Sequence, residues 1–193
     1  MFDRIETSSA FERVFPILQE AFPVTELRTK QKQKELLQDP LYRLYAIQNE
    51  TLEDVGVLAF WELGQDWIYM EHFAISPEKR NGGFGGFVLD SFLNQIQKNA
   101  VLEVEVPEDT LTQRRVAFYE RHGFYFNPYP YLQPPMREGQ SPLPLRLMTR
   151  PTKIDVDTYE RYRLCIHQKV YRFFQEEVGR VNKKEWTNYT NCL

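Results

Sequence analysis

The spacing of hydrophobic residues changes along the chain, and each spacing predicts a different kind of element. Apolar residues that recur every three or four positions predict amphipathic helices. The polar stretch 25–38 favours a solvent-exposed helix that ends before Pro40. Capping-box patterns begin two helices, at Ser9 and at Thr110, and Gly123 stands where a C-terminal cap belongs. The predicted helices are 9–22, 25–38, 84–98, 110–122 and 155–178.

Other stretches have the pattern of strands. Residues 67–75, WIYMEHFAI, are apolar at most positions, as in a strand that is covered on both faces. Residues 100–106, AVLEVEV, alternate strictly between apolar and polar. The predicted strands are 2–7, 41–47, 55–63, 67–75, 100–106, 124–135 and 142–149.

The order of these elements predicts the fold class. The helix 84–98 connects the strands 67–75 and 100–106, and such a crossover makes the two strands parallel neighbours. Short turns join the earlier strands, which are therefore expected to be antiparallel. We expect an α/β fold with a mixed, mostly antiparallel central sheet and helices on both faces. The 193 residues suit one domain over 1–150, followed over 151–193 by an amphipathic helix and polar tail that packs on the domain or forms a dimer.

Composition excludes several classes of protein. The chain is 42% hydrophobic and 15% aromatic, which is enough to build a core, and its net charge of -3 gives no basic surface for nucleic acid. The N-terminus has no apolar run of a secretory signal, and no stretch has the length of a membrane span. Cys165 and Cys192 have no metal-type spacing and indicate reduced thiols in a cytoplasmic protein. Three scattered histidines, His72, His122 and His167, predict no metal site.

Four of the nine glycines lie in RNGGFGGF, residues 80–87, between a predicted strand and a predicted helix. A turn of this kind exposes backbone N–H groups at the positive end of a helix and can bind an anion. The simplest alternative is a tight turn that binds nothing. A dinucleotide fingerprint would need a third glycine where Val88 stands, and a Walker loop would need Gly-Lys-Ser/Thr.

Two segments together carry a resemblance to a known family. HFAISPEKRNGGFGGFVLDSFL contains R-x-x-G-x-G over Arg80–Gly85, and RRVAFYERHGF covers 114–124. Together they resemble the coenzyme A-binding segment and a later motif of the GNAT superfamily of acyl-CoA N-acyltransferases, over about residues 55–125. The resemblance implies a GNAT-like sheet in which a parallel strand pair is splayed around the cofactor cleft, and acetyl-CoA as co-substrate without a metal.

The resemblance also implies which residues hold the cofactor. Backbone N–H groups of the glycine turn would bind the pyrophosphate, and the end of the preceding strand would pair with the pantetheine arm. Many members have asparagine where Thr112 stands and alanine where Arg115 stands. Arg114 and Arg115 therefore either contact phosphates or form a plain exposed helix face. The implied cofactor residues are Phe73, Ala74, Ile75, Arg80, Asn81, Gly82, Gly83, Phe84, Gly85, Gly86, Arg114 and Arg115.

Acetyl transfer to an amine needs a base and an acid. Tyr119 matches the tyrosine of the family and is the expected acid, although a core tyrosine is the alternative. Glu71 is the expected base or amine ligand, because a carboxylate in so apolar a strand needs a purpose or a partner. Strand alternation places Glu71 on one face with Phe73 and Ile75, and a structural His72 on the other.

The acceptor side is less specific in the sequence. Glu103 and Glu105 share one face of their strand and either bind the acceptor or form a solvated face near the sheet end. Tyr129 and Tyr131 project from the proline- and tyrosine-rich stretch 127–144, which is either a wall of the acceptor site or a rigid surface loop with buried tyrosines.

Taken together, these residues predict an N-acetyltransferase in which a primary amine attacks acetyl-CoA directly in a ternary complex. Neither cysteine lies in a motif that would activate it as a nucleophile. A non-catalytic module that binds acyl-CoA or a protein on the same fold is the first alternative, and a nucleotide-binding oxidoreductase is the second. The acceptor, a small-molecule or peptide amine, is left open by the sequence.

Overall fold

The computed structural model describes residues 1–80 and 82–171, and in these ranges the strands form one sheet. Their order is β1-β2-β3-β4-β5-β8-β6, with β7 also paired to β8. Only β4 and β5 are parallel, and the other paired strands are antiparallel, as the sequence predicted. The strands are β1 Phe2–Arg4, β2 Tyr42–Gln48, β3 Asp54–Trp61, β4 Trp67–Ile75, β5 Asn99–Glu105, β6 Tyr125–Phe126, β7 Tyr131–Gln133 and β8 Leu143–Arg150.

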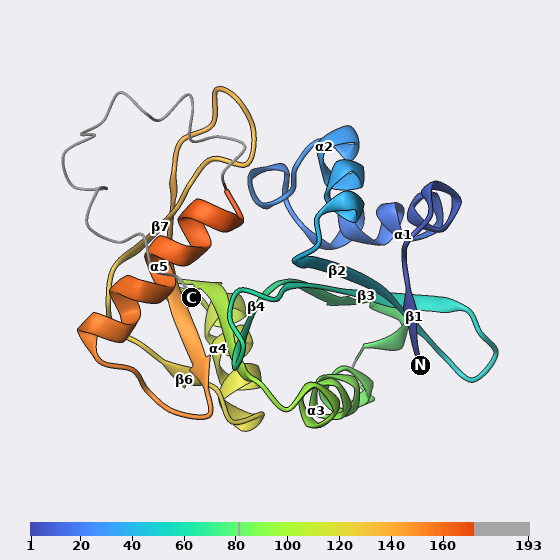
Figure 1. Cartoon of the computed structure of the whole chain (residues 1–193). Helices are drawn as coiled ribbons and strands as arrows, with labels where there is room; N and C mark the ends of the chain where they lie inside the picture. Colours follow the sequence, from blue (N-terminus) through green and yellow to red (C-terminus); the bar gives the residue numbers. More distant parts are fainter. Residues whose placement is uncertain (81, 172–193) are drawn as a thin grey trace.

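Helices cover both faces of the sheet (Figure 1). On one face, α1, α5 and the segment around α2 pack on a hydrophobic cluster that includes Phe15, Trp61 and Ile166. On the other face, α3 and α4 pack on a second cluster around Phe60 and Phe92. The helices are α1 Ser8–Ala21, α2 Lys30–Glu35, α3 Phe84–Ile96, α4 Thr110–Arg121 and α5 Val156–Lys169, and the short 3-10 helices are η1 Val24–Glu26, η2 Leu36–Gln38 and η3 Pro77–Lys79.

The residues that cap α1 and α4 differ from those predicted. The side chain of Thr7, not Ser9, accepts a hydrogen bond from the backbone N–H of Ala10 at the start of α1. Asp109 caps α4 and forms the capping box with Thr112, one residue before the predicted start. In both places a better-placed oxygen, one or two residues upstream, satisfies the first free N–H groups.

The predicted helix 25–38 is correct only over residues 30–38, which form α2 and η2, and wrong as one continuous helix from residue 25. The chain forms η1, then an extended step at Leu27, and only then α2, which Thr29 caps. The segment is also not fully solvent-exposed, because Arg28, Gln33 and Leu36 are buried. A buried arginine needs a partner, and the extended step lets Arg28 reach one in β4.

The sheet opens between its two parallel strands. Pairing of β4 with β5 ends at Met70 and Leu102, although both strands continue. At the same level the register with β3 shifts, so that Met70 pairs with Phe60 and His72 with Ala59, which leaves Glu71 as the extra residue of a β-bulge. The bulge bends β4 away from β5 and splays the pair.

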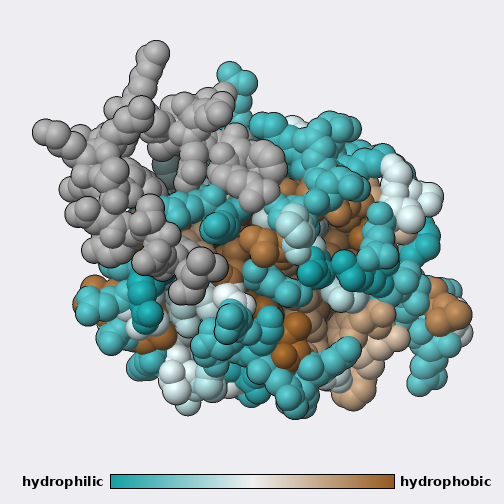
Figure 2. All heavy atoms as spheres, viewed as in Figure 1, coloured by the Kyte–Doolittle hydropathy of each residue, from teal (hydrophilic) through white to brown (hydrophobic). Residues whose placement is uncertain are grey.

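The late strands and the C-terminal helix complete the fold. The predicted strand 124–135 is split into β6 and β7, because the prolines in the intervening NPYP cannot donate backbone hydrogen bonds. The helix α5 packs on the domain through Tyr159, Cys165 and Ile166. The helix ends at Lys169, with Val170 as its C-cap residue, so the prediction that it continues to about 178 is wrong at residues 170–171, and 172–193 lie outside the described residues. The face seen in Figure 2 is mostly hydrophilic, with apolar residues in scattered groups.

Candidate active site

A cleft of about 610 Å³ occupies the opening between β4 and β5. At one end it is lined by the glycine turn and by α4, including Gly83, Arg114 and Tyr119. At the other end it is lined by carboxylates, Glu71 and Glu103 among them. The strand splay therefore joins the predicted cofactor residues and the predicted catalytic residues in one space.

The glycine turn presents the start of α3 to this cleft. Gly83 is the N-cap residue, with a φ of 76° that favours glycine, and no side chain caps the helix. The first N–H groups of a helix have no partner within it, so those of the first turn are available to an anion. The side chain of Arg80 donates from Nε to the carbonyl oxygen of Ile75 at 2.7 Å and fastens the turn to the end of β4. Asn81 lies outside the described residues.

The other glycines of the turn have different surroundings. Gly82 has open space around the position of a Cβ atom. A Cβ on Gly86 would lie 2.7 Å from the ring of His122, whose Nδ1 is paired with Asp90 at 2.7 Å. Gly86 therefore lines the cleft and also lets α3 approach the end of α4.

The free edge of β4 faces the cleft through alternate residues. The N–H of Ser76 bonds to Val55 in β3, so the backbone groups of Ala74 point to β3 as well. Those of Phe73 and Ile75 then point to the other edge, where β5 has already diverged. This edge is open to an extended chain, as a pantetheine arm would be.

Glu71 is buried in an ion pair with Arg28. Its Oε1 lies 2.6 Å from Nη1 of Arg28, and its Oε2 accepts a hydrogen bond from the indole N–H of Trp61 at 3.2 Å. Because of the bulge, His72 lies on the same side as Glu71, with Nδ1 3.7 Å from Oε2, and the predicted placement on opposite faces is wrong. Phe73 and Ile75 lie in the hydrophobic cluster on the other face, so Glu71 shares its face with Tyr69 but not with Phe73 or Ile75.

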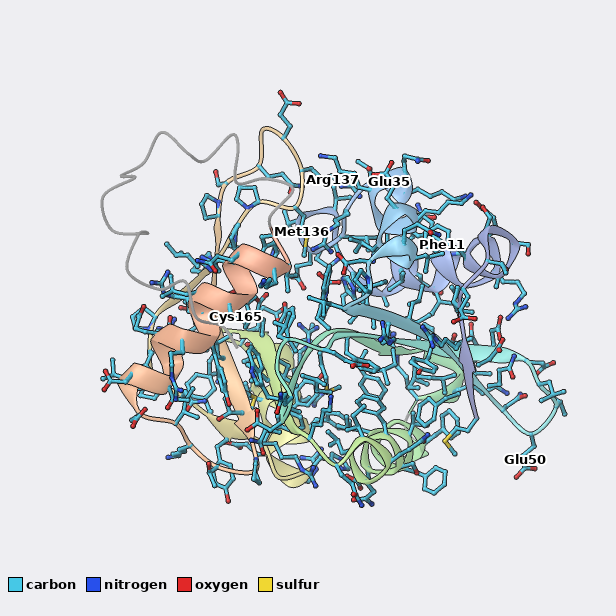
Figure 3. All side chains as sticks on the ribbon, in the orientation of Figure 1. Phe11, Glu35, Glu50, Met136, Arg137 and Cys165 are labelled. Atoms are coloured by element: carbon cyan, nitrogen blue, oxygen red, sulfur yellow. The ribbon has the colours of Figure 1, made fainter. Side chains whose placement is uncertain are left out.

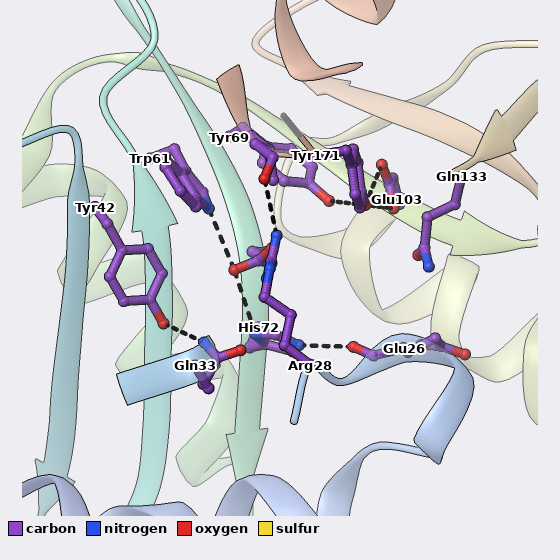
Figure 4. A network of polar contacts seen from close by, with 12 residues as sticks. Glu26, Arg28, Gln33, Tyr42, Trp61, Tyr69, His72, Glu103, Gln133 and Tyr171 are labelled. Atoms are coloured by element: carbon purple, nitrogen blue, oxygen red, sulfur yellow. Dashed lines mark hydrogen bonds and ion pairs between the residues drawn. The ribbon is translucent and has the colours of Figure 1, made fainter. Parts of the chain in front are cut away.

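The partners of Glu103 in the described part of the chain are tyrosine hydroxyls, and none of them is a cation (Figure 4). Tyr131 donates to its Oε1, and the hydroxyl of Tyr171 lies 3.1 Å from Oε1 and 3.0 Å from Oε2. Burial raises the pKa of Glu103 to about 7, although the tyrosine hydroxyls oppose the shift. The alternative of a solvated strand face is therefore wrong for Glu103.

The neighbouring acids extend this side of the cleft. Glu105 is only half-buried and pairs with Arg115 on α4. The pKa of Glu26, on η1, is raised mainly by burial and to a smaller extent by the nearby charge of Glu105. Since Arg28 and Arg115 are each paired with another acid, Glu26 and Glu103 add negative charge to this end of the cleft.

The predicted tyrosines lie in different places. Tyr119 lines the cleft, and burial raises its pKa to about 12, so the hydroxyl stays protonated near neutral pH. Tyr131 donates its hydroxyl hydrogen bond to the carboxylate of Glu103. Tyr129 packs on Tyr159 of α5 and donates to the carbonyl oxygen of Ile154, away from the residues that line the cleft, and we do not retain it in the site.

Side chains from three other parts of the chain hold the segment 24–28 above the cleft. Every carbonyl oxygen of this segment accepts a side-chain hydrogen bond, from Gln140, Gln133, His72 and, for the last two, Arg137. Figure 3 shows Arg137 and Met136 on the side of the molecule where α2 lies. The stretch 127–144 thus borders the cleft through Gln133 and Met136 rather than through Tyr129.

The sequence analysis missed Glu26, which lines the cleft, and three residues that hold the site from outside the lining: Arg28, Arg137 and Tyr171. None of these three stands in a motif, and each contacts Glu71, Glu103 or the segment 24–28 from a part of the chain distant in sequence. In the described part of the chain no group of histidine, cysteine or acidic residues has a metal-binding arrangement. Across 1–80 and 82–171, no helix has the length and apolar character needed to cross a membrane.

The fold is shared with solved acetyltransferases. A GNAT family acetyltransferase from Elizabethkingia anophelis, solved with acetyl-CoA bound, is 16% identical, with a TM-score of 0.54 over 77% of this chain and 95% of that one. The spermidine/spermine N-acetyltransferase SpeG from Vibrio cholerae is 13% identical, with a TM-score of 0.55 over 77% and 90%. At these identities the likeness shows the fold, which is the GNAT fold.

A nearer relative shows the family. A protein from Bacteroides thetaiotaomicron, assigned to the GNAT family of acetyltransferases, is 33% identical, with a TM-score of 0.82 over 89% of this chain and 98% of that one. The family model for the acetyltransferase (GNAT) domain matches residues 40–125, whereas no curated protein matches the sequence. The chain belongs to the GNAT family of acetyltransferases.

Proposed function

We propose that the protein transfers an acetyl group from acetyl-CoA to a primary amine, by direct attack in a ternary complex. The observation that carries this proposal is the single cleft that joins the uncapped start of α3 to Glu103 and Tyr119. The acetyl-CoA-bound structure with the same fold supports acetyl-CoA as the donor.

The donor would lie along the open edge of β4. The first-turn N–H groups of α3 would bind the pyrophosphate, with Arg114 as a nearby cation that lines the cleft. The backbone of Phe73 and Ile75 would pair with the pantetheine arm, which brings the thioester towards the acidic end of the cleft. Arg115 is paired with Glu105, so we assign it to that pair and not to a phosphate.

Glu103 is the residue that fits the base. The amine nitrogen attacks the thioester carbonyl carbon, the C–S bond breaks, and the nitrogen must lose a proton. A carboxylate whose pKa is raised to about 7 by burial can take that proton near neutral pH. Tyr119, still protonated there, would give its proton to the departing thiolate sulfur. Glu71, unlike Glu103, is held in a buried ion pair, so we propose that it holds Arg28 rather than acting as the predicted base.

The acceptor would enter the cleft as a cationic amine and lose a first proton to solvent to become the neutral nucleophile. The second proton, lost when the C–N bond forms, is the one that Glu103 takes. Glu26 and Glu103 attract a positive charge to this end of the cleft, and a fold relative acts on spermidine and spermine. Small-molecule and peptide amines both fit this description. A cytoplasmic location and a homodimer stay predictions.

The test is release of free coenzyme A from acetyl-CoA in the presence of a panel of small amines and peptide N-termini. We expect amine-dependent release that rises with pH through about 7 and falls at least tenfold in Glu103→Gln. If the protein binds acetyl-CoA but no amine of the panel causes release of coenzyme A, the result would favour the non-catalytic module instead.

A further inference from the structure

Tyr171, two residues after the end of α5, lies against Glu103, a residue that lines the cleft. It is 1% exposed, and its hydroxyl lies at hydrogen-bond distance from both oxygens of Glu103, 68 residues earlier in the chain. The hydroxyl of Tyr69 lies 3.3 Å from that of Tyr171. A carboxylate only accepts, so Tyr171 donates to Glu103 and its oxygen can accept from Tyr69.

A second set of contacts fixes Tyr171 from its other side. Arg28, held by Glu71, donates from Nη2 to the carbonyl oxygen of Val170 at 3.0 Å. The guanidinium carbon of Arg28 lies 5.9 Å from the centroid of the Tyr171 ring. Figure 4 shows Tyr171 and Tyr69 close to Glu103. The chain after α5 is therefore connected to β4 through Arg28 and to β5 through Glu103.

We propose that Tyr171 is a positioning residue that orients the Glu103 carboxylate and stabilises its charged form. Residues 170 and 171, which follow α5, would thus complete the base site. This inference rests on the proposed function, in which Glu103 takes the proton of the amine. Tyr171 itself touches no reacting atom.

Among the described groups around Glu103, only tyrosine hydroxyls stabilise its charged form. From β7 it faces Tyr131, and from β4 it faces Tyr69 and the charge of Glu71, which opposes ionisation of Glu103. On α5, burial and then Arg163 lower the pKa of His167 to about 4, so its ring, near Tyr131 and Tyr171, is neutral. Loss of the Tyr171 hydroxyl therefore removes one donor to the carboxylate, and no cation is positioned to replace it among these groups.

The direct test measures titration of Glu103 without any substrate. The carboxyl carbons of glutamate are labelled with ¹³C, and Glu103→Gln identifies the signal of Glu103. In Tyr171→Phe we expect the titration midpoint to move up by about one pH unit, the size that loss of one hydrogen bond to a charged group predicts. Tyr159→Phe is the matched control, because that hydroxyl, also from the C-terminal region, donates to the carbonyl oxygen of Pro130 at 2.5 Å.

An unchanged Glu103 midpoint in folded Tyr171→Phe, or an equal change in Tyr159→Phe, would overturn the proposal. If Tyr171→Phe does not fold, a fluorinated tyrosine at position 171 keeps the shape and strengthens the donor. The Glu103 midpoint should then move down, and an unmoved midpoint would again refute the role.

Kinetics separate this proposal from the proposed function. With an accepted amine, the acid limb of kcat/KM should move up in Tyr171→Phe by the same amount as the Glu103 midpoint, while acetyl-CoA binding is unchanged. A moved midpoint in a protein that transfers no acetyl group would support the contact with Glu103 but contradict the acetyltransferase proposal. A moved midpoint with an unmoved acid limb would contradict Tyr171 as a positioning residue for catalysis.

Discussion

Replacing Glu71 by glutamine should lower the free energy of unfolding, because the charge of Arg28 is then buried without its partner. The two side chains are 1% and 0% exposed and lie 2.6 Å apart. Removal of one member of such a buried pair costs about 3–5 kcal/mol of unfolding free energy. For a chain of this size, each kcal/mol lowers Tm by about 2–4 °C, so even the lower cost corresponds to roughly 6–12 °C.

Glu105→Gln is the matched control, because it removes an acid from an ion pair on the neighbouring strand. The side chains of Glu105 and Arg115 are 32% and 41% exposed, so water and salt screen their interaction. We expect a loss of less than about 1 kcal/mol. Urea unfolding followed by circular dichroism gives both values as changes in midpoint at constant slope.

The same comparison separates two roles for Glu71. If Glu71 holds Arg28, Glu71→Gln is destabilised, and a further Arg28→Met substitution restores part of the loss because the unpaired charge is gone. If Glu71 is instead the base, as the sequence predicted, Glu71→Gln folds with wild-type stability and loses acetyl transfer. That outcome would refute the structural role argued above.

Three further predictions concern the rest of the cleft. Tyr119→Phe should lower kcat more than about tenfold at unchanged stability, while Tyr129→Phe, outside the cleft, leaves kcat unchanged; equal kcat in both variants would remove Tyr119 as the acid. Gly83→Ala should cost about 1 kcal/mol of folding stability because φ is 76°, and it should also weaken acetyl-CoA binding. Gly82→Ala is the control, because a Cβ there meets open space, and it should change neither property. Equal acetyl-CoA binding in the two variants would contradict the anion site. Arg137→Ala frees two carbonyl groups above the cleft and should raise KM for the amine more than for acetyl-CoA; equal changes would contradict a role on the acceptor side.

Local patterns predicted much of the fold because they reflect local physics. The alternation in β5 and the apolar face of α3 follow from which side chains are covered, and both are present in the structure. The short connections predicted the antiparallel strands, and the crossover through α3 predicted the parallel pair. The glycine turn lies at the start of α3, as expected.

The errors arise where distant parts of the chain decide the local structure. The helical pattern over 25–38 is interrupted before α2 because Arg28 pairs with Glu71, 43 residues away. The bulge at Glu71 shifts one residue of β4 and so changes the predicted faces after it. Glu103 has the pattern of a solvated residue, and only the packing of Tyr131 and Tyr171 against it makes it half-buried. Two-residue alternation contains no information on such contacts.

The most direct test of the central claim is a thermal-shift titration with acetyl-CoA, with NAD and ATP as controls. A ligand at about 100 times its Kd stabilises the folded state by roughly 2.7 kcal/mol, which is a rise in Tm of about 5–11 °C for a chain of this size. We predict that acetyl-CoA produces this rise and that NAD and ATP do not. No rise with acetyl-CoA, or an equal rise with NAD or ATP, would contradict a coenzyme A site at the start of α3 and the acetyl transfer proposed from it.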